Sequence, residues 1–317
     1  MIPNPTRDPD LPALPLASWK DTLATVHMWT QVVGKVRLKL CPLVNHWWNV
    51  PFYLTARGMT TSAMPYSRQA NPGTISGTIS GTISGTIEVR FDFIDHKLVL
   101  ETSEGRSVAI ALKPQSVAEF YKESMAALSD LAVTVKIWTT PCEIPDPIPF
   151  EKDHVHAAYD PAAMHKFWRV LAWVDQVLKE FRAGFLGKAS PVHFFWGSFD
   201  LAVTRFSGRR APERPGADSM TREAYSHEVS SAGFWPGGGD IAGPAFYSYA
   251  APEPPGFAER RVRPQGAFYH PQLKEFLLMY DDVRTADSPK AALMEFLQST
   301  YDAAADAGKW DRRALER

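Results

Sequence analysis

The chain has 317 residues, 45% of them hydrophobic and 12% aromatic, which is enough apolar material for two domains or one large duplicated domain. Thirty-four basic residues nearly balance 35 acidic ones, and the resulting net charge of −1 argues against nucleic acid or anionic lipid as a partner. The N-terminal residues lack a signal-peptide pattern, and no apolar run approaches the length of a membrane span. Two cysteines far apart, Cys41 and Cys142, fit free thiols in a reducing compartment. We expect a cytoplasmic protein of undefined oligomeric state.

Apolar periodicity in the first half predicts a helix, an antiparallel sheet and a second helix. Residues 1–16 contain five prolines and are expected to form an irregular lead-in. Apolar residues at steps of three and four from Val26 to Leu40 predict an amphipathic helix, which Pro42 ends. Alternating apolar residues then predict strands at 47–57, 87–93, 98–100 and 108–112. Ser116 is expected to begin the next helix.

The second half follows a similar order. Large apolar residues from Phe167 to Phe185 predict an amphipathic helix, and strands are expected at 193–205, 245–249 and 275–280. Ser288 as N-cap and Pro289 at the first helical position predict the closing helix. We interpret this order as an internal duplication in an α+β protein, with two antiparallel sheets that each pack against amphipathic helices. The predicted repeats are residues 17–138 and 161–317, and residues 139–160 are the connector.

Two segments read as insertions within these repeats. In residues 73–88 the sequence Gly-Thr-Ile-Ser occurs three times before Gly-Thr-Ile-Glu. Four residues are twice the strand period, so each added unit keeps Ile75, Ile79 and Ile83 on one face, and we interpret the tract as a repeat expansion at a loop tip. Residues 207–244 are rich in arginine, proline and glycine, which predicts a long irregular excursion.

The two most aromatic stretches of the chain share a pattern. Residues 193–205 read HFFWGSFDLAVTR, and residues 46–58 repeat the order of histidine, aromatic residues, apolar strand, and threonine with arginine. Alternation along each strand places the more polar residues on one face, which predicts the lining of a pocket. The predicted ligand-binding residues are Trp47, Asn49, Tyr53, Thr55, Trp196, Ser198 and Thr204.

Asp200 is the strongest candidate for chemistry. A carboxylate between Phe199 and Leu201 in mid-strand is costly to bury unless it is paired or liganded. We predict that Asp200 acts as a base or a ligand anchor, and that Arg57 or Arg205 holds an anionic group. The alternative is that Asp200 forms a structural ion pair with one of these arginines.

Metal chemistry has weaker support. The weak candidate ligands are His154, His156, His227 and Glu228. The chain contains neither the His-Glu-x-x-His motif nor a paired-cysteine motif. We therefore predict no metal site and name no cofactor. Gly-x-Ser-x-Gly would require glycines where Trp196 and Asp200 stand, so Ser198 does not resemble a hydrolase nucleophile.

Several long phrases resemble an uncharacterised, mainly bacterial family known only as a domain of unknown function, DUF5996. They begin at Asn45 (NHWW), Thr55 (TARG), Phe91 (FDFIDH), Ser190 (SPVHFFWGSFD) and Phe296 (FLQSTY). The resemblance extends from about Leu14 to Arg313. It implies no activity, so no catalytic role transfers to any residue.

The residues themselves favour one function and leave two others open. We predict a small organic ligand in an aromatic and polar cavity formed by the duplicated halves, with enzyme activity undecided. The first alternative is a non-catalytic interaction module that presents exposed aromatic side chains to a partner protein. The second is a metal-dependent enzyme with histidine and carboxylate ligands.

Overall fold

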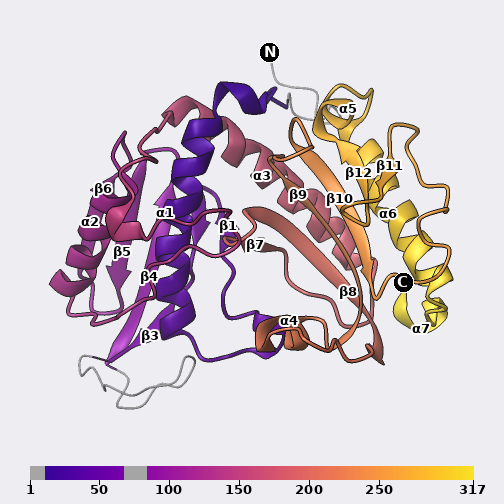
Figure 1. Cartoon of the computed structure of the whole chain (residues 1–317), viewed down its shortest axis with the longest axis horizontal. Coiled ribbons are helices and arrows are strands. Elements are labelled where there is room, and N and C mark those ends of the chain that lie inside the picture. Colours follow the sequence, from indigo (N-terminus) through magenta and orange to yellow (C-terminus); the bar gives the residue numbers. More distant parts are fainter. Residues whose placement is uncertain (1–10, 68–83) are drawn as a thin grey trace. The chain divides into compact units, whose positions relative to one another are not determined.

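The computed structural model describes residues 11–67 and 84–317 (Figure 1). These residues divide into two compact units. The N-terminal unit comprises the described residues of 17–168 together with 194–199, and the C-terminal unit comprises 11–16, 169–193 and 200–317. Each predicted half contributes an antiparallel sheet of six strands with helices beside it, which confirms the α+β class. Within the described residues, no helix combines the length and apolarity needed to cross a membrane.

The first sheet lies in the N-terminal unit, and its strands are mostly neighbours in sequence. Its order is β1-β2-β4-β5-β6, and β3 pairs with β4. The helices are α1 (Lys20–Leu40) and α2 (Val117–Asp130), and short 3-10 turns span Leu16–Ser18, Asn45–Trp47 and Phe150–Lys152. The strands are β1 (Tyr53–Thr55), β2 (Gly58–Thr60), β3 (Met64–Tyr66), β4 (Gly85–Asp92), β5 (Lys97–Thr102) and β6 (Ser107–Ala111).

Both helices of this unit form as the apolar pattern predicts. Trp29 of α1 is fully buried and stacks on Phe120 of α2, with 4.7 Å between the ring centroids. Ser116 caps α2: its hydroxyl accepts a hydrogen bond from the amide of Glu119, and the Glu119 carboxylate accepts one from the amide of Ser116. Phe120 also stacks on Phe91 of β4, with 6.5 Å between the ring centroids, so α2 packs on the apolar side of the sheet.

The predicted connector is held by polar contacts to α1. The buried Gln31 side chain donates to the carbonyl of Cys142 (2.8 Å) and accepts from the Cys142 amide (2.9 Å). The buried Lys35 ammonium donates to the Thr140 carbonyl (2.7 Å). Buried backbone groups need hydrogen-bond partners, and the polar side chains of α1 supply them for this segment.

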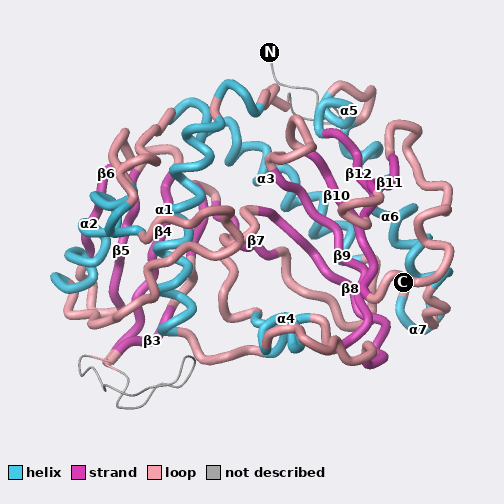
Figure 2. The backbone as a smooth tube through the Cα atoms, viewed as in Figure 1, coloured by secondary structure: helices cyan, strands magenta, loops and turns pink. Residues whose placement is uncertain are grey.

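The second sheet has the order β11-β12-β10-β9-β8-β7 (Figure 2). Its strands are β7 (His193–Phe195), β8 (Asp200–Arg210), β9 (His227–Trp235), β10 (Ala245–Ala251), β11 (Phe268–His270) and β12 (Glu275–Met279). The helices of this half are α3 (Pro161–Ala183), α4 (Ser219–Ala224), α5 (Tyr280–Arg284), α6 (Pro289–Ala307) and α7 (Arg312–Leu315). The Ser288 hydroxyl caps α6 and Pro289 is its first residue, as predicted.

Three predicted elements are wrong in detail. Residues 47–57 are not one strand, because His46 and Trp47 both adopt a φ of 60° in a 3-10 turn and only Tyr53–Thr55 is extended. The strand predicted at 193–205 is interrupted by a turn, in which Phe199 has a φ of 58°. Side-chain alternation therefore does not run through either stretch.

Residues 207–244 also differ from the prediction, because they do not form an irregular excursion. They contain the end of β8, the helix α4 and the strand β9, which lies between β8 and β10. Small residues such as Ser231, Ala232 and Gly233 lower the strand signal of β9 in the sequence, although its neighbours pair with it along most of its length.

The internal duplication and the repeat expansion in residues 73–88 stay predictions. Both halves contain a long helix, six strands and a closing helix, with α4 inserted between β8 and β9 of the second half, but this order alone does not test an internal duplication. Ile75, Ile79 and Ile83 of the repeat tract lie outside the described residues. The strand that follows, β4, buries Ile87 and Val89 on one face, as alternation predicts.

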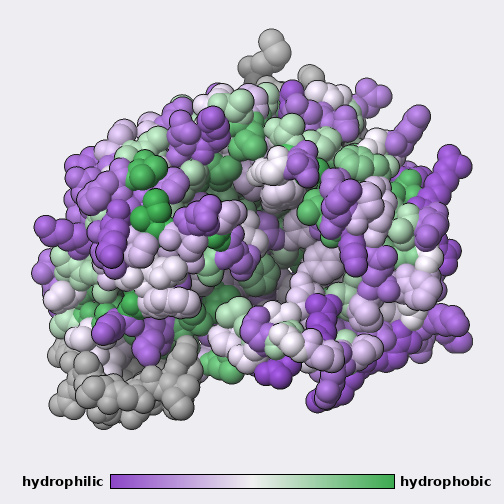
Figure 3. Space-filling model, in the orientation of Figure 1, coloured by the Kyte–Doolittle hydropathy of each residue, from purple (hydrophilic) through white to green (hydrophobic). Residues whose placement is uncertain are grey.

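Hydrophilic and hydrophobic side chains are interspersed over the surface drawn in Figure 3.

Candidate functional site

The candidate site lies on one face of the second sheet, within the C-terminal unit. Asp200 and Thr204 project from the same face of β8, because they lie four positions apart and side chains alternate along a strand. Thr204 pairs with Ser231 of β9, which pairs with Tyr249 of β10. Directly paired residues project to the same side, so these side chains share one surface. We call it the Asp200 face; it consists of Asp200, Thr204, Ser231, Tyr247, Tyr249 and Glu275.

A tyrosine from β10 reaches the Asp200 carboxylate across an intervening strand. The Tyr247 hydroxyl donates a hydrogen bond to Oδ2 of Asp200, and each residue is only 8% exposed. Gly233 of β9 pairs with Tyr247 and lies beneath this bridge. A Cβ atom at position 233 would lie 2.4 Å from the Tyr247 hydroxyl and 2.3 Å from the Leu201 carbonyl oxygen. The glycine therefore makes the bridge sterically possible.

Hydroxyl groups next to this bridge form two hydrogen-bonded pairs. The Thr204 and Ser231 hydroxyls are 2.9 Å apart, and the Tyr249 hydroxyl lies 3.0 Å from that of Tyr225, which follows α4. The rings of Tyr247 and Tyr249 are stacked with 6.2 Å between their centroids. The face is thus a continuous polar and aromatic surface whose side chains are held in place by their neighbours.

Burial keeps both tyrosines protonated. Removal from water, with the nearby negative charge of Asp200 as a further cause, raises the pKa of Tyr247 well above its usual value of 10. Burial likewise raises the pKa of Tyr249 well above that value, and the hydrogen bond with Tyr225 adds to it. Tyr247 therefore acts as a hydrogen-bond donor at physiological pH.

Glu275 of β12 is the titratable group of the face. Partial burial, with the charge of Asp200 as the second cause, raises the pKa of Glu275 from 4.5 to about 7. His270 of β11 is its cross-strand partner. Among the described residues, none forms a hydrogen bond or an ion pair with the Glu275 carboxylate. A half-buried carboxylate with such a pKa changes its protonation state near neutral pH, as general bases do.

The structure places Arg205 on the opposite face of β8. Its guanidinium carbon lies 3.5 Å from the ring centroid of Phe181 and 4.4 Å from that of Tyr301, and the group donates a hydrogen bond to the Phe181 carbonyl. The side chain is 2% exposed, and burial lowers its pKa to about 10. Arg205 therefore packs between α3 and α6 beneath the sheet, and it does not join Asp200 on the polar face.

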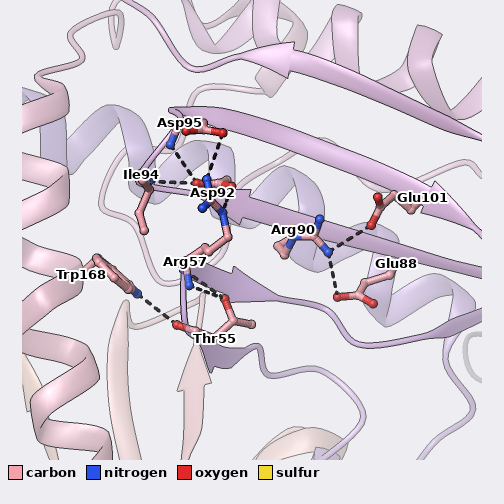
Figure 4. A network of polar contacts seen from close by, with 10 residues as sticks. Thr55, Arg57, Glu88, Arg90, Asp92, Ile94, Asp95, Glu101 and Trp168 are labelled. Carbon is pink, nitrogen blue, oxygen red and sulfur yellow. Dashed lines mark hydrogen bonds and ion pairs between the residues drawn. The ribbon is translucent and has the colours of Figure 1, made fainter.

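Arg57 belongs to a charge network of the N-terminal unit (Figure 4). Its Nε lies 2.6 Å from the Asp92 carboxylate and its Nη2 lies 3.0 Å from that of Asp95. Asp92 also accepts hydrogen bonds from the amides of Ile94 and Asp95 in the turn after β4. Burial acts to raise the pKa of Asp92, but these hydrogen bonds outweigh it and hold the pKa below its usual value. Arg57 thus stabilises a turn.

The other predicted ligand contacts lie in the N-terminal unit. Trp196 is buried, and its indole donates to the Val50 carbonyl (2.8 Å). The Thr55 hydroxyl accepts hydrogen bonds from the amides of Arg57 and Gly58 in a turn. Asn49 is buried and Ser198 is exposed. Trp47 and Tyr53 are partly exposed, and the Arg37 guanidinium lies 5.8 Å from the Tyr53 ring centroid. Of the predicted set, the structure brings only Asp200 and Thr204 together on one sheet face.

The four weak metal candidates make other contacts. His156 bonds to Asp153 (2.8 Å), Glu228 accepts from Arg209 (2.6 Å), and His227 contacts Ser226 (3.1 Å). His154 lies two residues from His156 and uses its amide to bond to Lys152. Within residues 11–67 and 84–317, no three histidine, cysteine, aspartate or glutamate side chains lie close enough to hold a metal ion. Both cysteines are free.

Most of the Asp200 face was not predicted from the sequence. Tyr247 and Tyr249 alternate with Phe246 and Ser248, so a second polar face was available in the strand predicted at 245–249. Gly233 within a run of small residues was the other signal, since an interior strand glycine often marks a close approach. Glu275 gave no signal, because nothing in its local sequence shows that Asp200 lies near it.

A buried histidine in the N-terminal unit predicts a pH dependence of stability. His27 of α1 donates through Nε2 to the Gly197 carbonyl (2.7 Å). Burial lowers the pKa of His27 from 6.5 to about 4, against the opposing effect of this hydrogen bond. The unfolded chain takes up the proton first as the pH falls, so this group destabilises the fold progressively between pH 6.5 and pH 4.

We expect His27→Gln to remove this loss, which amounts to about 2–3 kcal/mol in the free energy of unfolding. Denaturant unfolding of both proteins at pH 7 and pH 4.5 measures it. If the stability difference between the two proteins is the same at both pH values, His27 does not titrate as its burial implies.

Comparison with known proteins identifies a family but no activity. The model of the family of unknown function DUF5996 matches residues 11–317. No curated protein and no solved structure matches the chain. The resemblance inferred from the sequence phrases is thereby confirmed over nearly the whole length. The chain belongs to the family of unknown function DUF5996.

Proposed function

We propose that the protein binds a small organic ligand on the Asp200 face. The observation that carries the proposal is the Tyr247 hydroxyl held on the Asp200 carboxylate, beside Glu275, whose pKa is raised to about 7 by burial and, second, by the charge of Asp200. Tyrosine rings offer apolar contact area, and the two carboxylates offer directed hydrogen-bond acceptors. Such a mixture of aromatic surface and a few placed polar groups is typical of small-molecule sites.

The charge of the face favours a particular ligand chemistry. Asp200 and Glu275 place two carboxyl groups on this face. The predicted anion-binding residues Arg57 and Arg205 do not lie on it. A ligand with hydroxyl or amine donors would satisfy the acceptors and offset the cost of placing two carboxylates together. We therefore propose a hydroxyl- or amine-bearing ligand in place of the anionic one that the sequence suggested.

Acid–base catalysis is the second candidate, and the Glu275 carboxyl favours it. A general base is most effective when its pKa lies near the working pH. Glu275 would accept a proton from a bound hydroxyl or amine, while Tyr247, which stays protonated, would keep its hydrogen bond to Asp200 and hold that carboxylate in place beside the ligand.

The cellular setting is also a proposal. The near balance of 34 basic and 35 acidic residues supports a cytoplasmic role without a nucleic-acid partner. The free cysteines Cys41 and Cys142 fit a reducing compartment.

Native mass spectrometry and thermal shift with a panel of polyols and amino alcohols test the ligand. We expect at least one compound to bind the wild-type protein, and Asp200→Asn and Tyr247→Phe to weaken its binding by about tenfold or more. Tyr301→Phe is the matched control, because the buried Tyr301 also donates to a carboxylate of this unit, that of Glu316 (2.9 Å). The proposal fails if no compound binds, or if Tyr247→Phe and Tyr301→Phe behave alike.

A further inference from the structure

A separate cavity of about 240 Å³ lies in the C-terminal unit, where β9 begins, β10 ends and α6 ends. It shares no residue with the Asp200 face. Its apolar lining comes from Ala250 of β10, from Ala304 and Ala307 of α6, and from Trp310, which follows α6. Pro254 and Pro255 close another side. The small side chains leave room for a ring-sized group against the indole.

One carboxylate at this cavity is not balanced by a positive charge. Glu228 and Glu253 both line it. Glu228 is neutralised by Arg209, with 2.6 Å between Nη2 and the carboxylate oxygen. Glu253 accepts a hydrogen bond only from the uncharged Tyr269 hydroxyl, and among the described residues it forms no ion pair. The cavity therefore has a net negative charge at its rim.

The end of α6 is also negative, and the chain itself supplies a cation there. A helix of 19 residues ends at Ala307, and Gly308 caps it. The negative end of a helix dipole attracts cations within its last turn. The Arg209 guanidinium donates to the carbonyls of Gly308 and Lys309 (3.0 Å for Lys309), so the charge that is left uncompensated at the cavity is that of Glu253.

We propose that this cavity binds a small organic cation, a protonated amine carried on an apolar or aromatic body. The ammonium group would lie near Glu253, and the body would pack among the alanines against Trp310. The face of an indole attracts cations as well as apolar groups, so Trp310 suits both parts of such a ligand. A carboxylate ligand would instead be repelled by the charge of Glu253.

Isothermal titration calorimetry with benzylammonium chloride tests the proposal. We expect benzylammonium to bind, benzyl alcohol to bind about tenfold more weakly, and benzoate to give no binding. Ala307→Phe fills the cavity and is expected to abolish binding, while Glu253→Gln weakens it about tenfold. Glu259→Gln, an exposed carboxylate outside the lining, is the matched control and should leave the affinity unchanged.

The outcome is independent of the proposed function, because Asp200→Asn should not alter benzylammonium binding. Circular dichroism and the melting temperature show whether Ala307→Phe has folded, and Glu253→Gln provides the test if it has not. The proposal is overturned if benzylammonium does not bind at millimolar concentration, if benzyl alcohol binds equally well, or if Glu253→Gln and Glu259→Gln have the same affinity as the wild type.

Discussion

Replacing Gly233 with alanine is expected to lower the free energy of unfolding by about 3 kcal/mol. The new methyl group would lie 2.3 Å from the Leu201 carbonyl oxygen and 2.4 Å from the Tyr247 hydroxyl. The carbonyl belongs to the paired strand β8, so the backbone must shift, and the tyrosine must leave its place above β9. We expect the Tyr247 hydrogen bond to Asp200 to break as well, which would cost ligand affinity on the Asp200 face.

Chemical denaturation measures the loss of stability, and Gly243→Ala is the control. A Cβ atom at position 243 meets no atom within 4 Å, so this substitution should change stability by less than about 1 kcal/mol. If both glycines tolerate alanine equally, the tyrosine does not cross β9 in the way described.

Replacing Trp196 with alanine is expected to cost about 3–5 kcal/mol. The indole is 6% exposed, and its ring occupies the space above Gly34 of α1, where a Cβ atom would come within 2.3 Å of it. Its hydrogen bond to Val50 would be lost too. The substitution therefore creates a large cavity and leaves a buried carbonyl unsatisfied.

Trp138→Ala is the matched control for this loss, because Trp138 is 74% exposed and its removal should cost about 1 kcal/mol or less. Thermal and denaturant unfolding of both variants give the comparison. If both substitutions change the stability only slightly, Trp196 does not have the packing role that its contacts indicate. The ligand-stacking role predicted from the sequence would then be favoured.

Helices were the most predictable part of the fold. Their apolar stripes repeat over many residues, and local caps mark their ends, as at Ser116 and Ser288. The α+β class and the antiparallel sheets follow from such patterns. Strand boundaries were less predictable where the backbone turns: the positive φ angles of His46, Trp47 and Phe199 occur at bulky residues whose local sequence does not demand them.

The candidate site was predictable in its centre and not in its surroundings. Asp200 was predictable because burying a carboxylate between two large apolar residues is costly unless it is paired or liganded. Its partners depend on sheet register: Tyr247 reaches it only because β9 lies between β8 and β10 with Gly233 at the crossing point. Register over 47 residues of sequence separation is set by the whole sheet, so no local pattern could supply it.

Titration of Glu275 tests the central claim most directly. Carbon-13 NMR of the side-chain carboxyls, with the Glu275 signal assigned from its disappearance in Glu275→Gln, measures its pKa in the folded protein. We predict a pKa of about 7 in the wild type, and a lower value in Asp200→Asn, because the charge of Asp200 contributes to the shift. A pKa near 4.5 in the wild type, unchanged by Asp200→Asn, would show that the two carboxyls do not share one face and would contradict the proposed site.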